Sequence, residues 1–448
     1  MSFEHLKTIY RDFDIRGKFP DEISPEEVYK IGKTVVTLFN LKKVGIGRDI
    51  RPSGKILFDS LARGILEMGG TVVDLGVCTT PMTYFFCGTT DVDATIMITA
   101  SHMPSEYNGL KISIDDARPV TADLLQHIRK IVGEHTFSTV LENGKMMSHH
   151  LQKDWIDYFK KQFDFSNSQF SIVIDPANMV GYLEIETCRA FSPNITVHTI
   201  FDTPDHTCPN HEANPIKLET LAELGNEVRT QHADIGVAFD GDADRVGFVD
   251  ENGTPIPSDL IGALLARYVL AKNPHGTVVC DIRSSQALIE EVERLGGTAI
   301  REKVGHTYIR TRMRKENAVL GIELAGHFFF KDSHYSEGGP LPIFMILALM
   351  KQEGKTLSQL VHEVKKYFHS GEINSHVTRT PHEIYASLQT RFSDAKFDTT
   401  DGLTITDKTW WANIRPSAND PVMRLNIESS NREVMELTRD EILAIIRA

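Results

Sequence analysis

The sequence predicts an α/β protein of three similar domains with mixed sheets, followed by a small α+β domain, arranged around a central cleft. Three observations support this prediction. The chain has 448 residues, too many for a single hydrophobic core. A unit of strand, loop, helix and strand recurs three times. After about Ser370 the pattern changes to short strands with two helices, near His382–Arg391 and from Arg432 onward.

The repeated unit begins with a short β-branched strand that ends at an aspartate. The first copy runs from Val44 to about residue 77, with its helix ending near Glu67. The second copy covers residues 170–201 and the third covers residues 277–304. Such alternation predicts parallel or mixed sheets with right-handed crossovers. The three strand-end aspartates are Asp49, Asp175 and Asp281.

Each copy is followed by another buried strand, which runs into an unusual loop. Ser101 and His102 follow the first of these strands, residues 240–245 the second, and residues 323–327 the third. Ligand sites in α/β sheets gather at the carboxyl ends of strands, so three similar domains would each direct one loop at a shared cleft. The alternative is that the units merely look alike, as strand–helix–strand units do.

The domain boundaries are predicted from polar and turn-rich segments. These segments are the polar stretch His135–Lys153, the turn-rich residues 251–258, and Tyr367–Gly371. The predicted domains are 1–145, with the serine loop; 146–254, with the acidic loop; 255–368, with the third loop; and 369–448.

Composition excludes several classes of function. The net charge of −13 disfavours broad binding to nucleic acid or to anionic lipid. Five scattered cysteines without a CxxC motif indicate reduced thiols rather than disulfides or a zinc site. The first residues lack an apolar signal core, and the longest apolar stretch, 341–350, is about half a membrane span. We expect a cytoplasmic monomer or homodimer with no nucleic-acid or membrane partner.

The acidic loop predicts a metal site. Asp240, Asp242 and Asp244 place three carboxylates at alternating positions between two strands. So many hard oxygen ligands repel one another unless a hard cation such as Mg²⁺ neutralises them. The alternative is a solvated acidic loop that binds nothing.

Cations accompany each special loop of this acidic protein. Arg245 directly follows the acidic loop, and we expect Arg16 of FDIRG and Lys111 of GLK to add cations near the Ser101 segment. The segment 415–421 together with Arg424 gathers two guanidiniums and short polar donors, which suit phosphate oxygens. A polar hairpin turn is the alternative for that segment. We expect a phosphorylated small molecule as the ligand.

Ser101 is predicted to carry a phosphoryl group. The segment lacks the GxSxG pattern of hydrolases, and neighbouring side chains in an extended loop point apart, so Ser101 with His102 does not predict a catalytic triad. Proximity to the predicted Mg²⁺ site favours phosphoryl transfer instead.

These segments together resemble the α-D-phosphohexomutase family, and most of all its phosphomannomutase/phosphoglucomutase branch. The resemblance covers essentially the whole chain. It rests on FDIRG (13–17), GRDIRPSG (47–54), TASHMPSEYNGLK (99–111), DGDADR (240–245), KVGHTYIRTRM (303–313), GIELAGH (321–327), GEINSHV (371–377) and RPSANDPVMRL (415–425).

The resemblance implies an enzyme that interconverts hexose 1-phosphate and hexose 6-phosphate, with mannose or glucose as the sugar. Phosphorylated Ser101 would give its phosphoryl group to the substrate, forming a hexose 1,6-bisphosphate that serves as intermediate and activator. Mg²⁺ would be held by that phosphate and by the three aspartates. His102 and Lys111 would assist proton transfer, with Arg16 nearby. The implied substrate-binding residues are Arg245, Lys303, His306, Glu323, Ala325, His327, Arg415, Ser417, Asn419 and Arg424.

Three departures from the family pattern concern rate and sugar preference more than the reaction. Met103 stands where the family has asparagine, and Ala325 where it has serine. The phosphate loop reads Ala418-Asn419-Asp420 in place of the usual residues.

Three alternative functions are weighed against the mutase. Phosphoglucosamine mutase usually has Asp-Asn-Gly in the turn after the serine, whereas Tyr107 precedes Asn-Gly here and favours neutral hexoses. A phosphatase would release the phosphoryl group to water, which a closable cleft disfavours. A non-catalytic sugar-phosphate binder would not need all three aspartates.

Overall fold

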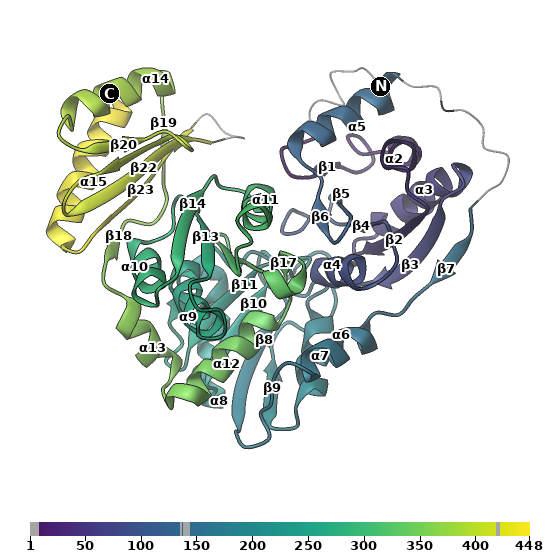
Figure 1. The fold of residues 1–448 in the computed structure, drawn as a ribbon, viewed down its shortest axis with the longest axis horizontal. Helices are drawn as coiled ribbons and strands as arrows, with labels where there is room; N and C mark the ends of the chain where they lie inside the picture. The colour runs from purple at the N-terminus through teal and green to yellow at the C-terminus, as the bar shows by residue number, and fades with distance from the viewer. Residues whose placement is uncertain (1–8, 135–136, 138–143, 418–421) are drawn as a thin grey trace.

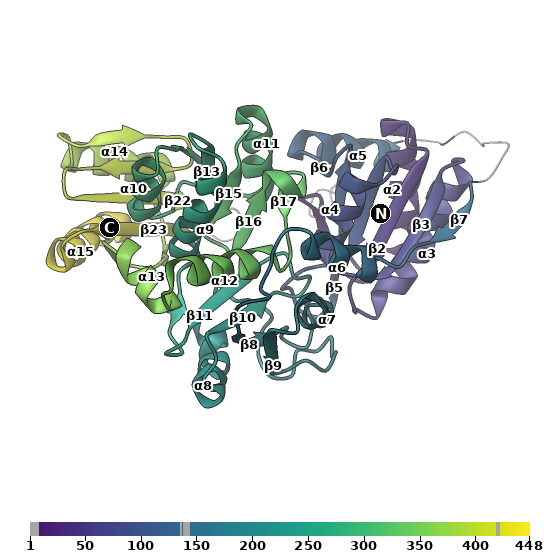
Figure 2. The ribbon, with the colours of Figure 1, turned by 60° about the horizontal axis from the view of Figure 1, so that its bottom comes forward.

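The computed structural model describes residues 9–134, 137, 144–417 and 422–448. Four sheets follow one another along the chain. In both ribbon views the first and last domains lie at opposite ends of the molecule, with the second and third between them (Figures 1 and 2). None of the described helices is long and apolar enough to cross a membrane.

The first sheet is mixed and runs in the order β1-β5-β4-β2-β3-β7, with β6 paired to β5. Parallel pairing joins β2 to β3 and β4, whereas β5 is antiparallel to β4. Its strands are β1 (Ile15–Lys18), β2 (Lys43–Arg48), β3 (Thr71–Val77), β4 (Ala94–Ile98), β5 (Tyr107–Ile114), β6 (Arg118–Pro119) and β7 (Met146–Ser148). Its helices are α2 (Pro25–Phe39), α3 (Ser53–Glu67), α4 (Thr80–Thr89) and α5 (Ala122–Glu134).

The second and third sheets run in the orders β12-β11-β10-β8-β9 and β14-β13-β15-β16-β17. The second domain contains α6 (Gln152–Lys160), β8 (Phe170–Asp175), α7 (Tyr182–Phe191), β9 (Ile195–Thr199), η1 (Leu218–Leu221), α8 (Ala222–Gln231), β10 (Ile235–Phe239), β11 (Val246–Asp250) and β12 (Pro255–Ile256). The third contains α9 (Ser258–Lys272), β13 (Thr277–Asp281), α10 (Gln286–Arg294), β14 (Thr298–Glu302), α11 (His306–Glu316), β15 (Leu320–Glu323), β16 (His327–Phe330), η2 (Lys331–Ser333), β17 (Ser336–Glu337), α12 (Leu341–Glu353) and α13 (Leu357–Val364).

The three sheets share one strand order. The matching runs are β5-β4-β2-β3, β11-β10-β8-β9 and β16-β15-β13-β14. In each run three strands are parallel and the fourth is antiparallel. Each special loop therefore joins a buried parallel strand to its antiparallel neighbour. This shared order confirms the predicted three-fold repeat.

The C-terminal domain is a sheet in the order β18-β23-β22-β21-β20, with β19 also paired to β23. Thr380 and Glu383 form a capping box at the start of α14, which explains why that helix begins at Pro381. The elements are β18 (Phe368–His369), β19 (Ile373–His376), α14 (Pro381–Arg391), β20 (Lys396–Asp398), β21 (Leu403–Thr406), β22 (Trp410–Pro416), β23 (Val422–Ser429) and α15 (Arg432–Arg447).

Two sheets extend slightly past the predicted domain boundaries. β7 places residues 146–148 in the first sheet, and β12 places residues 255–256 in the second. Both are short edge strands of two or three residues, for which sequence patterns carry little signal.

The apolar clusters show which domains pack together through a shared hydrophobic core. One cluster joins α4 of the first domain to the second and third domains, whereas the C-terminal domain has a cluster of its own. Polar contacts join the last domain to the third, including Ser285 Oγ donating to Glu428 Oε1 at 2.9 Å. The position of the last domain therefore depends partly on polar contacts.

A buried carboxyl lies where the first and second domains meet. Glu184 of α7 accepts hydrogen bonds from Thr79 Oγ1 at 2.8 Å and from Trp155 Nε1 at 2.9 Å. Burial raises the pKa of Glu184 to about 7. The folded protein therefore binds this proton more tightly than the unfolded chain, so stability falls as pH rises from about 4.5 to about 7.

Glu184→Gln is expected to raise stability at pH 8 by on the order of 3 kcal/mol, because it keeps the acceptor and removes the buried charge. The measurement is the melting temperature of the first calorimetric transition between pH 5 and pH 8.5. Glu27 and Glu428 also have pKa values raised to about 7, so the variant should flatten the pH dependence without abolishing it. An unchanged slope would contradict this account.

Candidate functional site

Ser101 lies in a turn directly after β4, in a left-handed backbone conformation with φ of 53°. Such a conformation is unfavourable for a residue with a Cβ and needs outside support. Arg51 supplies it by donating to the carbonyl of Ser101 at 2.9 Å and to that of Met103. Thr99 Oγ1 accepts the N–H of Ser101 at 2.9 Å and donates to Asp49 at 2.7 Å. The serine is thus held by a buried polar brace.

One contact of this brace recurs in all three repeats. The strand-end aspartate accepts the backbone N–H two residues later, at 2.9 Å for Asp49, 2.8 Å for Asp175 and 2.7 Å for Asp281. In the third repeat the other oxygen of Asp281 accepts the N–H of Leu324 at 2.8 Å, inside the third loop. The sequence pattern places these aspartates at the strand ends but predicts no role for them.

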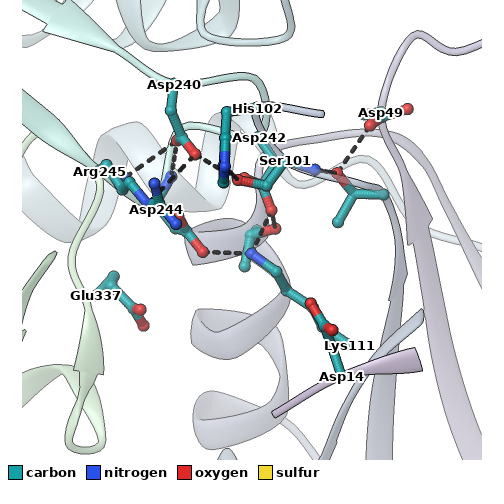
Figure 3. Close-up of polar contacts among 12 residues, drawn as sticks. Asp14, Asp49, Ser101, His102, Lys111, Asp240, Asp242, Asp244, Arg245 and Glu337 are labelled. Carbon is teal, nitrogen blue, oxygen red and sulfur yellow. Dashed lines mark hydrogen bonds and ion pairs between the residues drawn. The ribbon is translucent and has the colours of Figure 1, made fainter. Parts of the chain in front are cut away.

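Ser101 Oγ donates a hydrogen bond to Asp240 Oδ2 at 2.6 Å, which joins the first and second special loops (Figure 3). His102 Nδ1 lies 3.3 Å from the same Oγ. The expectation that neighbouring Ser and His side chains point apart is therefore wrong here. It assumed an extended loop, whereas the positive φ of Ser101 turns the two side chains toward each other.

The acidic loop packs tightly against the serine loop. A Cβ at Gly241 would lie 2.2 Å from the carbonyl oxygen of Ser101, so only glycine fits there. Asp240, Asp242 and Asp244 are at most 4% exposed, and one oxygen from each lies within 4.8 Å of the others. Thr80 Oγ1 donates to Asp242 Oδ2 at 2.6 Å.

Lys111 supplies positive charge to this cluster. Its Nζ lies 2.6 Å from Asp242 Oδ2 and also contacts Asp244 Oδ2 (Figure 3). Although burial opposes it, the two carboxylates hold the pKa of Lys111 well above its ordinary value. Burial and the charges of Asp244 and Asp242 raise the pKa of Asp240 to about 7.

The donor set fits Mg²⁺. Asp242 Oδ1 and Asp244 Oδ1 are buried and have no hydrogen-bond partner, which is costly unless something else engages them. Three convergent carboxylate oxygens are what this hard cation prefers. Which residues ligate an ion stays a prediction.

The third loop reaches the same cluster. Arg245 Nε lies 3.1 Å from His327 Nε2, and His327 Nδ1 lies 3.0 Å from Glu337 Oε1. Although burial opposes it, Asp244 and Glu337 raise the pKa of His327 to about 8. His306 begins α11, with its ring 6.0 Å from that of His327. Burial, together with the charge of His327, lowers the pKa of His306.

Burial and the cations Arg245 and Arg16 lower the pKa of His102 to about 2. His102 is therefore neutral at pH 7. Arg16 lies on β1 and pairs with Asp14. The residues predicted from the serine loop, the acidic loop and the third loop therefore contact one another in the structure, whereas the sequence showed only the order of these loops along the chain.

Glu323 and Ala325 form the rest of the third loop. Glu323 ends β15, is 6% exposed, and has its pKa raised by burial. Its Oε1 lies 3.9 Å from Arg283 Nη2. Ala325 lies in the turn that follows. Lys303 is exposed, and its ammonium lies 6.0 Å from the Tyr308 ring, so its role in substrate binding stays a prediction.

The predicted phosphate loop joins β22 to β23. Arg415 and Arg424 are directly paired across these strands, and Arg424 Nη2 donates to Ser417 Oγ at 3.1 Å. Both guanidiniums also contact Glu372. Asn419 lies outside the described residues.

Comparison with known proteins identifies the family. Sequence models of phosphoglucomutase/phosphomannomutase alpha/beta/alpha domains I, II and III match residues 7–139, 153–253 and 257–367. The chain belongs to the phosphoglucomutase/phosphomannomutase family. This membership confirms the resemblance drawn from the eight motifs, and the three matched domains confirm the predicted fold class together with the C-terminal sheet.

Relatives of this phosphoglucomutase/phosphomannomutase-family chain match it along nearly its whole length. A phosphomannomutase of Methanocaldococcus jannaschii is 33% identical over 444 residues, covering 98% of this chain and 97% of that protein. A phosphomannomutase of Escherichia coli K12 is 33% identical over 434 residues, covering 94% and 95%. The crystal structure of a phosphoglucomutase/phosphomannomutase family protein from Burkholderia thailandensis superposes with a TM-score of 0.90 at 25% identity, covering 98% and 97%. These relatives support the activity of a hexose phosphate mutase, so the protein is an enzyme.

Four residues of this family member escaped prediction. Arg51 occurs in a quoted motif, yet its hold on the serine loop follows only from folding. Glu337 lies ten residues after His327, and the two side chains meet because β16 pairs with β17. Glu372 occurs in the quoted motif GEINSHV, yet its contacts with arginines follow only from folding. Arg283 carried no recognisable pattern, since single charged residues in loops are common.

Proposed function

We propose that this chain interconverts hexose 1-phosphate and hexose 6-phosphate, with Ser101 as the phosphoryl carrier and mannose or glucose as the sugar. The observation that carries the proposal is the hydrogen bond from Ser101 Oγ to Asp240 at 2.6 Å, within a buried set of three carboxylates and Lys111. A hydroxyl so placed is ready to exchange its proton for a phosphoryl group.

The reaction is a pair of phosphoryl transfers. The hydroxyl oxygen of a bound hexose monophosphate attacks phosphorus, the bond from phosphorus to Ser101 Oγ breaks, and a hexose 1,6-bisphosphate forms. The sugar hydroxyl loses its proton and Ser101 Oγ gains one, so charge balances. The reverse transfer from the other sugar oxygen restores phosphoserine and leaves the isomeric monophosphate.

His102 and Lys111 are the groups that we assign to proton movement. His102 Nδ1 lies 3.3 Å from Ser101 Oγ, within reach of a proton on that oxygen, although burial and the nearby cations lower its pKa and make it a weak base before the serine is phosphorylated. Lys111 is charged in this arrangement and favours the anionic forms around it. Arg16 adds positive charge beside His102.

Asp240, Asp242 and Asp244 would hold Mg²⁺, with phosphorylated Ser101 as a further ligand. When bound, the ion neutralises charge on the transferring phosphoryl group. Arg245 extends the cationic surface from this point toward His327 and the third loop.

The remaining predicted residues would bind the substrate. Glu323 presents a buried carboxylate for sugar hydroxyls, with Ala325 in the same turn. Arg415 and Arg424 would hold the phosphate that does not react, because a pair of guanidinium forks suits phosphate oxygens. Lys303, His306, Ser417 and Asn419 are the other residues that we propose to contact the substrate.

The test is ³¹P NMR of purified protein with Mg²⁺, a trace of hexose 1,6-bisphosphate, and mannose 1-phosphate or glucose 1-phosphate. Conversion of either sugar to its 6-phosphate is expected, and comparing the two ranks the sugars. Release of inorganic phosphate would indicate a hydrolase instead. Conversion of glucosamine 1-phosphate alone would indicate a phosphoglucosamine mutase.

A further inference from the structure

Glu372 lies among three guanidinium groups at the junction of the third and last domains. It occupies the segment between β18 and β19. Its carboxylate is 3.3 Å from Arg415 Nη2, 3.3 Å from Arg424 Nη1 and 3.5 Å from Arg283 Nη1. Arg283 is also paired with Asp281 at 2.8 Å, so Glu372 is left as one carboxylate shared between the two cations Arg415 and Arg424.

Arg415 and Arg424 have few other anionic partners. In the part of the chain that the structure describes, Glu372 is the one carboxylate within 4 Å of either guanidinium. The Nε atoms of both arginines are buried and donate no hydrogen bond to a described residue. Burial and the neighbouring charge of Arg283 lower the pKa of Arg415, as expected for crowded cations. The guanidinium groups of Arg415 and Arg424 can therefore bind an anion that carries more charge than the carboxylate of Glu372.

Arg283 connects Glu372 to the third loop. Its Nη2 lies 2.8 Å from Asp281 Oδ2 and 3.9 Å from Glu323 Oε1. The same Asp281 oxygen accepts the N–H of Leu324 at 2.8 Å. A continuous series of charged contacts therefore runs from the third loop, through Arg283 and Glu372, to the phosphate loop of the last domain.

We propose that Glu372 is a positioning residue that acts as the internal counter-anion of the phosphate loop: an arriving phosphate displaces it from Arg415 and Arg424, and it stays paired with Arg283. This inference rests on the proposed function only in assigning a phosphate to those two arginines. Glu372 keeps the guanidinium forks ordered before phosphate arrives. Once displaced, Glu372 pairs with Arg283 alone, and this ion pair strengthens the contact between the last domain and the third domain beside the third loop.

Glu372→Gln tests the displacement directly. Because phosphate no longer competes with a charge-assisted pair, the variant should bind inorganic phosphate about tenfold more tightly in calorimetric titration of the full chain. For the hexose phosphate reaction, KM and kcat should both fall, because binding becomes easier while the tie through Arg283 is lost. Phosphate binding that is unchanged or weaker in this variant would overturn the proposal.

Two controls define the site and the specificity of the effect. Glu353→Gln removes a carboxylate that pairs with Arg267 at 3.1 Å and Lys355 at 2.9 Å, away from the phosphate loop, and should leave the phosphate affinity unchanged. Arg424→Ala should weaken phosphate binding in both the parent chain and the Glu372→Gln variant. If the tightening survives Arg424→Ala, phosphate binds elsewhere and the proposal is wrong.

Arg283→Met tests the connection to the third domain. If Arg283 acts through Glu372, the substitution should weaken phosphate binding several-fold in the parent chain but less than twofold in the Glu372→Gln background. Equal effects in both backgrounds would overturn the relay. Phosphate titrations do not require turnover, so a chain that bound phosphate as described but isomerised no hexose phosphate would refute the proposed function alone.

Discussion

Mutase turnover is expected to fall by about 10⁴-fold or more when Ser101 is replaced with alanine, because the phosphoryl carrier is lost and no other described hydroxyl hydrogen-bonds to Asp240. The measurement is conversion of hexose 1-phosphate in a coupled assay, alongside intact mass after incubation with hexose 1,6-bisphosphate. The parent protein should gain one phosphate and the variant none. Binding of hexose phosphate should remain within a few-fold, since Arg415 and Arg424 are untouched.

Ser105→Ala is the matched control for this variant. Ser105 lies in the same segment, but its Oγ is 2.7 Å from His206 Nδ1 rather than near the acidic loop. Its removal should leave turnover nearly unchanged. If Ser101→Ala retained turnover within tenfold of the parent, the phosphoryl carrier would have to be another group.

Asp240→Asn is expected to lower kcat by about 10³-fold and to raise the Mg²⁺ concentration needed for half-maximal activity at least tenfold. The substitution removes one charged donor from the set of three. It can keep the hydrogen bonds that Asp240 Oδ1 accepts from the backbone of Asp244 at 3.1 Å and Arg245 at 3.2 Å. The effect should therefore come from lost charge rather than from a collapsed loop. Steady-state rates across a Mg²⁺ titration, after chelation of bound metal, measure it.

Asp234→Asn controls for a lost carboxylate in the same domain. Asp234 lies just before β10, where it accepts the N–H of Ser171 at 2.7 Å, whereas Asp240 lies just after that strand. This control should leave the Mg²⁺ requirement unchanged. A parent-like Mg²⁺ titration for Asp240→Asn would refute the assignment of this aspartate as a ligand.

The sequence was sufficient to predict the repeated architecture, since strand-and-helix periodicity depends on local residue patterns. It also predicted that Ser101, Asp240 and Glu323 would follow equivalent strands, and the shared strand order explains why their loops converge. Parallel strands end at the same edge of a sheet, so position along the chain translates into position in space.

The orientation of side chains in the loops, and the contacts between residues far apart in the sequence, could not be predicted in this way. The left-handed turn at Ser101 depends on the brace from Arg51, which lies 50 residues earlier. Lys111 meets Asp242 across 131 residues, and no local pattern specifies such a partner. Glu372 lies in a quoted motif but received no role, because its significance comes only from the three arginines that surround it.

The contact between Ser101 and Asp240 also has a consequence for biosynthesis. Their side chains come from different sheets and are separated by 139 residues. At roughly 5–20 residues per second, a ribosome adds the acidic loop on the order of ten seconds after the serine segment. A nascent first domain therefore displays the serine without its carboxylates or Arg245. The phosphoryl transfer that we propose for Ser101 therefore requires the first two domains to have docked.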